Sequence, residues 1–350
     1  MNTGTGHRSM VKAKSAARRA WVLVLLVAAG VLPLSAQQVV RVGFFPNITH
    51  PQALVGQAQG TFEKSLGPGI RIEWKAFNAG PSAIEALFAG AIDLTYIGPS
   101  PTISGFNQSH GEAFRLIAGA SSGGASLVVR AGSGITKPSD FHGKKVATPQ
   151  LGNTQDVALR AWLHANGLKT IDRGGDVQVL PTANPDQLTL FLRGGLDAAW
   201  APEPWASRLI HDGHGQLFLD ERKLWPNGQF VAAHLIVATR FLQQHPDLVK
   251  RWVDAHVAVT DWINAHPADA RTVLNQQIQK LTGKALPLDV LNEAYSRLSV
   301  TYDPLRSSLV TSAQRSFDAG FLRRPPDLSQ LYDLKLLNQV LVEKGKKPIL

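Results

Sequence analysis

The sequence predicts an α/β protein in which parallel sheets are covered by helices on both faces. Between residues 39 and 239, short apolar segments of strand length alternate with longer segments whose apolar residues recur at helical spacing. Loops rich in Gly, Pro, Ser and Asn follow most of these strands. Because such sheets bind ligands at the carboxyl ends of their strands, these loops are where we expect a site.

The stretch from Asn78 to Pro101 shows this pattern most clearly. Its first helix has Pro81 in the first turn, where a missing N–H costs nothing, and it ends at Gly90. A short apolar strand follows at 92–97, and residues 98–101 begin the next helix. Two helix N-termini therefore lie beside strand ends. Their free N–H groups and partial positive charges can together hold a small anion.

The other elements follow from similar signals. Residues 70–74 alternate apolar and charged side chains, as a half-buried strand does. Asn153 and Thr154 cap one helix, and Pro185 opens the next. We expect the remaining strands at 39–45, 114–120, 125–130, 146–147, 176–180, 196–199, 216–219 and 230–238. We expect the remaining helices at 51–59, from Trp200 onward, from Pro246 onward, and at 267–283, 288–298, 305–321 and 328–342.

Composition excludes several classes of protein. The chain has 350 residues, 44% hydrophobic and 18% charged, which is ordinary for a globular protein. The formal charge of +10 is inflated by the first 36 residues, which hold five Lys or Arg and no acid. The rest has 31 basic and 26 acidic residues, a net charge of +5. These basic residues are scattered and form no stripe interleaved with aromatics, so we expect no nucleic-acid binding.

Residues 1–36 have the pattern of a cleavable signal peptide. Basic residues lead, an apolar core runs from Ala20 to Leu34, and a small-residue site precedes Gln37. The apolar core is short for a membrane span of about 20 residues. The chain has no Cys, which excludes disulfides, thiol catalysis, Cys-ligated zinc and a lipid anchored through an N-terminal Cys. We therefore expect an exported protein in the periplasm.

Several short motifs, taken in order, resemble one family. They cover about residues 40–321, and they resemble periplasmic substrate-binding proteins of ABC importers in the nitrate, sulfonate and taurine group. The motifs are Gly43-x-Phe45-Pro46 with Pro51 and Gly60-x-Phe62; Gly80-x-Ser82-x-x-Glu85-Ala86-Leu87-x-x-Gly90-x-x-Asp93; Gly98-x-x-Pro101; Asp140-x-x-Gly143-Lys144-Lys145-Val146; and Trp200-x-Pro202-Glu203-Pro204.

The resemblance implies a two-lobed periplasmic-binding-protein fold of type II with extra C-terminal helices. One lobe would comprise residues 39–124 plus 232–350, and the other residues 125–231. Two crossing strands, near Gly123-Gly124 and Val231-Ala232, would join the lobes. The ligand would lie between them and be enclosed by hinge closure. The expected partners are a small anion and a membrane permease, and we expect a monomer that uses no cofactor.

Candidate ligand-binding residues lie on the loops after the strands. Hydroxyl and N–H groups at Ser82, Ser100, Asn153 and Thr154 can hold the oxygens of an anion, although each can also simply cap a helix. Asn47 and His50 lie on the first loop, and Ser121 lies at the end of the strand that precedes the first crossing. A His in such a position can pair with an acidic ligand or can make only local hydrogen bonds.

The remaining candidates have strong structural alternatives. Trp200, with Trp205 nearby, can form an aromatic wall for an organic group or can pack in the core. Glu203 would repel an anion about 4 Å away by roughly 4 kcal/mol at an effective dielectric of about 20. It therefore either pairs with an amine on the ligand or is occupied by backbone N–H groups or an Arg. His234 interrupts an apolar strand and is either a core residue or a cleft contact.

We expect a binding protein for an organic sulfonate, of the aliphatic or taurine type, rather than an enzyme. His211-x-x-His214 has no third ligand at a recognisable spacing, so we expect no metal site. Nitrate, bicarbonate or a pyrimidine precursor of thiamine are alternative ligands. A pyrimidine synthase shares this fold, but its Cys-rich motif cannot exist here. A sensor ectodomain would need a second membrane span, and the sequence contains none.

Overall fold

The computed structural model describes Met1 and residues 37–349. The expected signal peptide falls almost entirely on residues 2–36, outside the described part. Within the described part, no helix combines the length and the apolar character that a membrane span requires.

A six-stranded sheet forms the larger layer of the fold, with strand order β11-β4-β10-β3-β1-β2. β1 runs parallel to β3, with Val42 opposite Leu94, whereas β10 runs antiparallel to both of its neighbours, β3 and β4. The strands are β1 (Gln38–Phe44), β2 (Ile70–Ala76), β3 (Leu94–Ile97), β4 (Phe114–Gly123), β10 (Val231–Ala238) and β11 (Leu298–Val300).

Helices cover both faces of this sheet because its strands are apolar on both sides. In β10, Leu235 and Val237 belong to one core cluster and Ile236 belongs to the other, as the two-residue period of a strand requires. The first cluster packs against α2 (Pro51–Gln59), α3 (Thr61–Leu66), α9 (Thr239–Gln244), α10 (Pro246–Ala265), α11 (Pro267–Thr282), α12 (Leu288–Ser296) and α14 (Lys335–Glu343). The second packs against α4 (Gly80–Phe88), α5 (Pro99–Gln108) and α13 (Arg306–Asp318).

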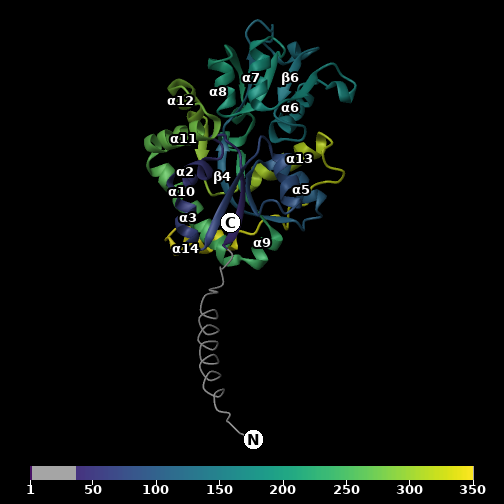
Figure 1. The fold of residues 1–350 in the computed structure, drawn as a ribbon. Coiled ribbons are helices and arrows are strands. Elements are labelled where there is room, and N and C mark those ends of the chain that lie inside the picture. Colours follow the sequence, from purple (N-terminus) through teal and green to yellow (C-terminus); the bar gives the residue numbers. More distant parts are fainter. Residues whose placement is uncertain (2–36, 350) are drawn as a thin grey trace. The chain divides into compact units, whose positions relative to one another are not determined.

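A five-stranded sheet of order β7-β6-β8-β5-β9 carries the middle of the chain. Figure 1 shows α6 and α7 beside β6 of this sheet, and α8 packs against β5 and β8. Its elements are β5 (Ala125–Arg130), β6 (Lys145–Thr148), α6 (Thr154–Ala165), β7 (Gln178–Pro181), α7 (Asn184–Leu192), β8 (Ala198–Pro202), α8 (Trp205–His211) and β9 (Gly215–Asp220). Four short 3₁₀ helices complete this part, at Pro138–Phe141, Ile171–Arg173, Glu221–Leu224 and Pro226–Gly228.

The chain passes from one sheet to the other at Gly123 and Gly124 and returns at Val231, where β10 begins. Both glycines have positive φ values, 82° and 75°. A side chain at Gly123 would lie 2.3 Å from the Arg297 carbonyl oxygen, so this turn requires glycine. The strands at this crossing also correct the expectation of parallel sheets. The departing strands β4 and β5 and the returning strand β10 pair antiparallel with their neighbours, so both sheets are mixed.

Some expected elements differ from those observed. Trp200 does not begin a helix, because β8 continues through Pro202 and α8 starts only at Trp205. The helix expected at 328–342 begins at Lys335, since the preceding segment instead forms a bridge between Leu116 and Tyr332. The sequence patterns did not predict α3, α9 or the short strand β11.

An aromatic stack in the first core cluster gives a test of the packing. The rings of Phe62 and Trp252 are stacked with centroids 4.1 Å apart, and both side chains are almost fully buried. We expect Phe62→Ala to lower the free energy of unfolding by about 3–5 kcal/mol, because it leaves a cavity in a packed core. Urea unfolding followed by circular dichroism measures this. Phe88→Ala is the matched control: its ring is 39% exposed, so it should cost less than about 1 kcal/mol, and equal losses would contradict this account.

Candidate functional site

A small polar cavity lies where loops from both sheets meet. We call it the polar cavity. Its volume of about 20 Å³ admits about one water molecule. No charged side chain is among the described residues that line it. These residues are Phe45, Asn47, Thr49, His50, Asn78, Gly98, Asn153, Thr154, Gln155, Asn184, Pro202 and Ala232.

The N-terminal ends of four helices meet at the polar cavity. His50, Gly98 and Asn153 are the N-cap residues of α2, α5 and α6, and Asn184 is the first residue of α7. No side chain caps α2, α5 or α7. The N–H groups in the first turn of each of these helices therefore have no side-chain acceptor. Each helix end also carries a partial positive charge. The polar cavity is therefore lined by partial positive charges without containing a cation, and Asp156 and Asp186 in the first turns of α6 and α7 offset part of this charge.

His50 contributes a neutral donor to this cavity. The Phe45 N–H donates to its Nδ1 (3.4 Å), so the ring proton is on Nε2 and is available to a ligand. Burial, helped by the neighbouring His234, lowers the pKa of His50 to about 3. The imidazole is therefore uncharged at neutral pH and acts as a hydrogen-bond donor rather than as a counter-ion.

Two buried polar atoms on the cavity wall lack a partner. They are the Thr154 hydroxyl oxygen and the Asn184 side-chain oxygen, and both residues are less than a tenth exposed. Buried polar atoms are normally hydrogen-bonded, so these two atoms are available to a ligand that occupies the cavity. Thr154 also packs closely on the facing loop. A side chain at Gly98 would lie 2.4 Å from its hydroxyl oxygen, which explains the glycine there.

Of the ten candidate site residues, four line the polar cavity: Asn47, His50, Asn153 and Thr154. The Asn47 side-chain oxygen accepts from the Trp205 indole N–H (3.0 Å), and that of Asn153 accepts from the N–H of Thr154. Asn153 therefore caps α6 as expected and also lines the cavity. The capping role and the position at a site coexist in one residue.

Four other candidates support the cavity from outside. Ser82 donates to the Gln150 side-chain oxygen (3.3 Å), and this bond joins the loops of the two sheets. Ser121 donates to the carbonyl of Thr49 (2.6 Å) and so fixes a lining residue. Ser100 is buried in the first turn of α5. His234 bonds through Nε2 to the Thr102 hydroxyl (2.7 Å), which itself donates to the carbonyl of Gly98, so it steadies the start of α5 rather than lining the cavity.

Trp200 is a core residue, which corrects its assignment to a ligand wall. On β8 it faces α6, packs against Trp162, and is fully buried. Its indole N–H donates to the Glu221 carboxylate (2.9 Å), which also accepts from Trp225 (3.3 Å). Burial raises the pKa of Glu221 to about 7, although these two donors and the nearby Arg315 act in the opposite direction.

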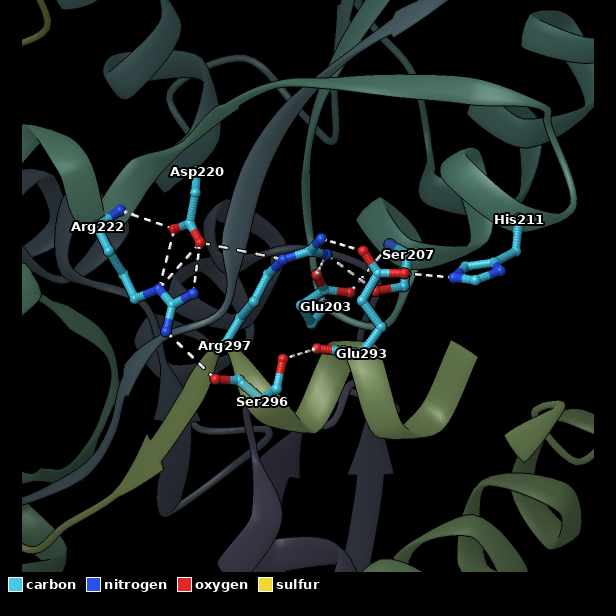
Figure 2. A network of polar contacts seen from close by, with 8 residues as sticks. All are labelled: Glu203, Ser207, His211, Asp220, Arg222, Glu293, Ser296 and Arg297. Atoms are coloured by element: carbon cyan, nitrogen blue, oxygen red, sulfur yellow. Dashed lines mark hydrogen bonds and ion pairs between the residues drawn. The ribbon is translucent and has the colours of Figure 1, made fainter. Parts of the chain in front are cut away.

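Glu203 is also occupied, which corrects its assignment to the ligand. Figure 2 shows its carboxylate bound to Arg297 (2.7 Å), and the Ser207 N–H donates to its other oxygen (3.0 Å). Of the expected alternatives, the Arg and the backbone N–H are both present. Burial raises the pKa of Glu203, whereas Arg297 and Ser207 lower it. Arg297 also contacts Glu293 and lies 4.0 Å from Asp220.

Eight lining residues were not among the candidates. Asn78 and Gly98 lie in loops that the sequence located without giving them a role. Asn184 directly precedes Pro185, and a polar residue at a helix start was the signal that could have identified it. The others are Phe45, Thr49, Gln155, Pro202 and Ala232, which carry no local signal of a site.

A larger cavity of about 410 Å³ adjoins the polar cavity and shares Asn47, Asn78 and Asn184 with it. We call it the apolar cavity. Trp205, Phe77, Ile278 and Leu286 are among its walls. The other lining residues are Pro46, Pro185, Pro204, Arg208, Asp212, Thr282, Lys284, Ala285 and Pro287.

In the His211-x-x-His214 motif, His211 is paired with acidic side chains. His211 contacts Asp289 (3.2 Å) and Glu293, the latter visible in Figure 2. Within residues 37–349, no group of three or more His, Asp or Glu side chains is placed to hold a metal ion.

Comparisons with known proteins agree with this fold. The model of the NMT1-like family matches residues 35–278. The taurine-binding periplasmic protein of Escherichia coli (strain K12) is 28% identical over 246 residues, 69% of this chain and 72% of that protein. A putative aliphatic sulfonates-binding protein of Bacillus subtilis (strain 168) is 25% identical over 312 residues, 87% of this chain and 88% of that protein.

A similar solved structure is the alkanesulfonate-binding protein SsuA from Xanthomonas axonopodis pv. citri. It has a TM-score of 0.68 and 20% identity, and the match covers 82% of this chain and 95% of that one. The two-lobed periplasmic-binding-protein fold expected from the sequence is thereby confirmed.

The buried ion pair gives a second test of the structure. Arg297→Met leaves the Glu203 carboxylate buried without its cation, so we expect the free energy of unfolding to fall by about 3–5 kcal/mol. Arg71→Met is the matched control, because Arg71 pairs with Glu73 (2.7 Å) at the surface, where such a pair contributes less than about 1 kcal/mol. Urea unfolding measures both variants, and an equally small loss in each would refute the importance of the buried pair.

Glu221 gives a prediction about pH. Because its folded pKa of about 7 lies above its ordinary value of 4.5, the folded protein holds a proton that the unfolded chain releases between these pH values. Its contribution to stability is present at pH 4.5 and is lost as the pH rises through 7. Glu221→Gln removes this pH-dependent contribution, because Gln does not titrate. The variant should gain stability relative to the native protein, by up to about 3 kcal/mol, as pH rises from 4.5 to 8. Urea unfolding across this pH range measures both proteins, and a constant difference in stability between them would contradict the prediction.

Proposed function

Because this chain belongs to the NMT1-like family, we propose that it is the extracytoplasmic solute-binding protein of an ABC importer and that it captures an organic sulfonate. Its relatives include a protein named as taurine-binding and periplasmic and another named as an aliphatic sulfonates-binding protein. We infer that this protein likewise acts in the periplasm, after removal of residues 1–36, and that it works as a monomer with a membrane permease as partner.

The observation that carries the proposal is the character of the polar cavity. Four helix N-termini, the neutral His50 donor and the unpartnered Thr154 hydroxyl all favour a small anion. A sulfonate presents three equivalent oxygens that accept hydrogen bonds, and it stays ionised at all physiological pH values. It therefore matches a cavity that offers several donors and no cation.

We propose that binding proceeds by hinge closure between two lobes, residues 39–124 with 232–350 and residues 125–231. The bonds between Ser82 and Gln150 and between Trp205 and Asn47 join these two parts of the chain beside the cavity. With these bonds formed, the polar cavity has only about 20 Å³, room for about one water molecule, so it must widen to accept a sulfonate group. Entry therefore requires the two parts to separate, and the turn at Gly123 and Gly124 is the expected hinge.

The test is a thermal-shift screen of the purified protein. The panel holds ethanesulfonate, longer alkanesulfonates, taurine, nitrate, bicarbonate and a pyrimidine. A ligand at about 100 times its dissociation constant should stabilise the protein by roughly 2.7 kcal/mol. Stabilisation by sulfonates alone is expected. Stabilisation by nitrate alone would replace the proposed ligand, and stabilisation by a pyrimidine alone would refute an anion site.

Thr154→Val tests the site itself. The Thr154 hydroxyl has no partner, so its removal should leave stability unchanged or slightly raised. Loss of a hydrogen bond to a charged ligand should weaken sulfonate binding about tenfold or more, measured by calorimetry. Thr272→Val, an exposed position on α11, is the matched control and should bind as the native protein does. Unchanged affinity in Thr154→Val would remove Thr154 from the site.

A further inference from the structure

The apolar cavity adjoins the polar cavity. Asn47, Asn78 and Asn184 line both, so the apolar cavity is the neighbouring space for the remaining atoms of a ligand whose charged end occupies the polar cavity. The volume of about 410 Å³ lies in the range of cavities that enclose drug-sized ligands. A nitrate ion would leave this space empty, and the two-carbon chain of taurine would fill little of it.

The walls of the apolar cavity suit a hydrocarbon or an aromatic ring. Trp205 and Pro204 face it from the segment that starts α8, and Phe77 faces it from the loop before α4. Ile278 and Leu286 close it from α11 and the segment after it. A tail that enters this space leaves water for apolar surroundings, which tightens binding about fourfold for each buried methylene.

The same walls offer no free carboxylate to an ammonium group. Glu203, the carboxylate that could have bound an amine, is held by Arg297 and lines neither cavity. Asp212 is the one acidic side chain among the described residues lining the two cavities, and Arg208 already pairs with it (2.9 Å). Taurine would therefore bury its positive charge with only a neutral acceptor, the Asn184 side-chain oxygen, and no counter-charge, which is costly.

We infer that the apolar cavity holds the organic tail of the ligand and that the protein selects sulfonates with long alkyl or aryl tails over taurine. This inference rests on the proposed function and names its substrate class. The wall at Thr282–Pro287 lies beyond residues 35–278, the part that the family model matches. The preference of this protein for the organic tail of its ligand therefore depends partly on a segment outside the region that the family model matches.

The charged residues of the apolar cavity do not draw the sulfonate group away from the polar cavity. Arg208 is neutralised by Asp212 and stacks over the Trp205 ring, with its guanidinium carbon 4.8 Å from the ring centroid. Lys284 is exposed to solvent, which weakens its attraction for an anion. The sulfonate is therefore expected at the helix ends of the polar cavity and not at Lys284.

Calorimetric titration of the purified protein with ethanesulfonate, hexanesulfonate, octanesulfonate, naphthalenesulfonate and taurine tests the inference. We expect affinity to rise with tail length, with octanesulfonate binding at least about 100-fold more tightly than ethanesulfonate and with taurine binding most weakly. Equal affinities across the series, or taurine binding most tightly, would overturn the inference and leave the proposed function intact. Binding of no sulfonate at all would instead overturn the proposed function, and this inference with it.

Ala285→Phe tests the location of the tail by filling the cavity. We expect octanesulfonate binding to weaken about tenfold or more while ethanesulfonate binding stays within about twofold. Leu288→Phe is the matched control, because Leu288 is 72% exposed, lies three residues further on and does not line the cavity. Melting temperatures confirm that both variants fold. Equal weakening of both ligands in Ala285→Phe would place the tail elsewhere. A large loss of affinity for both sulfonates in Lys284→Ala would show that the sulfonate group lies at Lys284 and not in the polar cavity.

Discussion

A carboxylate with no exposed surface, Glu203, is held where the chain crosses between the two sheets, and much of the structure depends on it. Its side chain binds Arg297, its N–H donates to the carbonyl of Gly124, and the Gly124 N–H donates to the carbonyl of Arg297. Side chains and backbone thus connect the same three residues. A buried charge needs its partner at a fixed distance, so the pair fixes the geometry of the crossing. The crossing in turn sets how closely the loops of the two sheets approach each other at the polar cavity.

The polar cavity handles charge in the opposite way, by excluding ionised side chains altogether. A buried cation would lose its hydration, at a cost of several kcal/mol. Helix ends avoid this cost because their partial charges belong to the backbone and are already oriented by folding. Each contributes roughly 0.3–1 kcal/mol with an exposed anion and up to about 2 kcal/mol in a partly buried site. The ends of α2 and α5, which have neither a side-chain cap nor an acid in the first turn, therefore supply the larger part of this attraction.

Local signals in the sequence predicted the loops that build the cavity and four of the residues that line it, but not the other eight. Asn47, His50, Asn153 and Thr154 lie at helix starts marked by Pro, Asn or Thr, and such marks depend only on neighbouring residues. Trp200 was misplaced because the same apolar run fits a strand or the start of a helix, and only pairing with β5 and β6 decides between them. Arg297 was not identified as the partner of Glu203, since 94 positions separate them and neither carries a local mark of the other.

The absence of charged side chains on the walls of the polar cavity has a consequence for the conditions in which the protein works. Surface charges act over about 10 Å at moderate ionic strength, and added salt shortens this reach. The field of a helix end acts only within about one turn, and most of the residues that line the cavity are buried. Because buried interactions are screened less than exposed ones, salt weakens this attraction less than it weakens a surface ion pair. A protein that binds an anion in this way has nearly the same affinity for it at low and at high salt concentration.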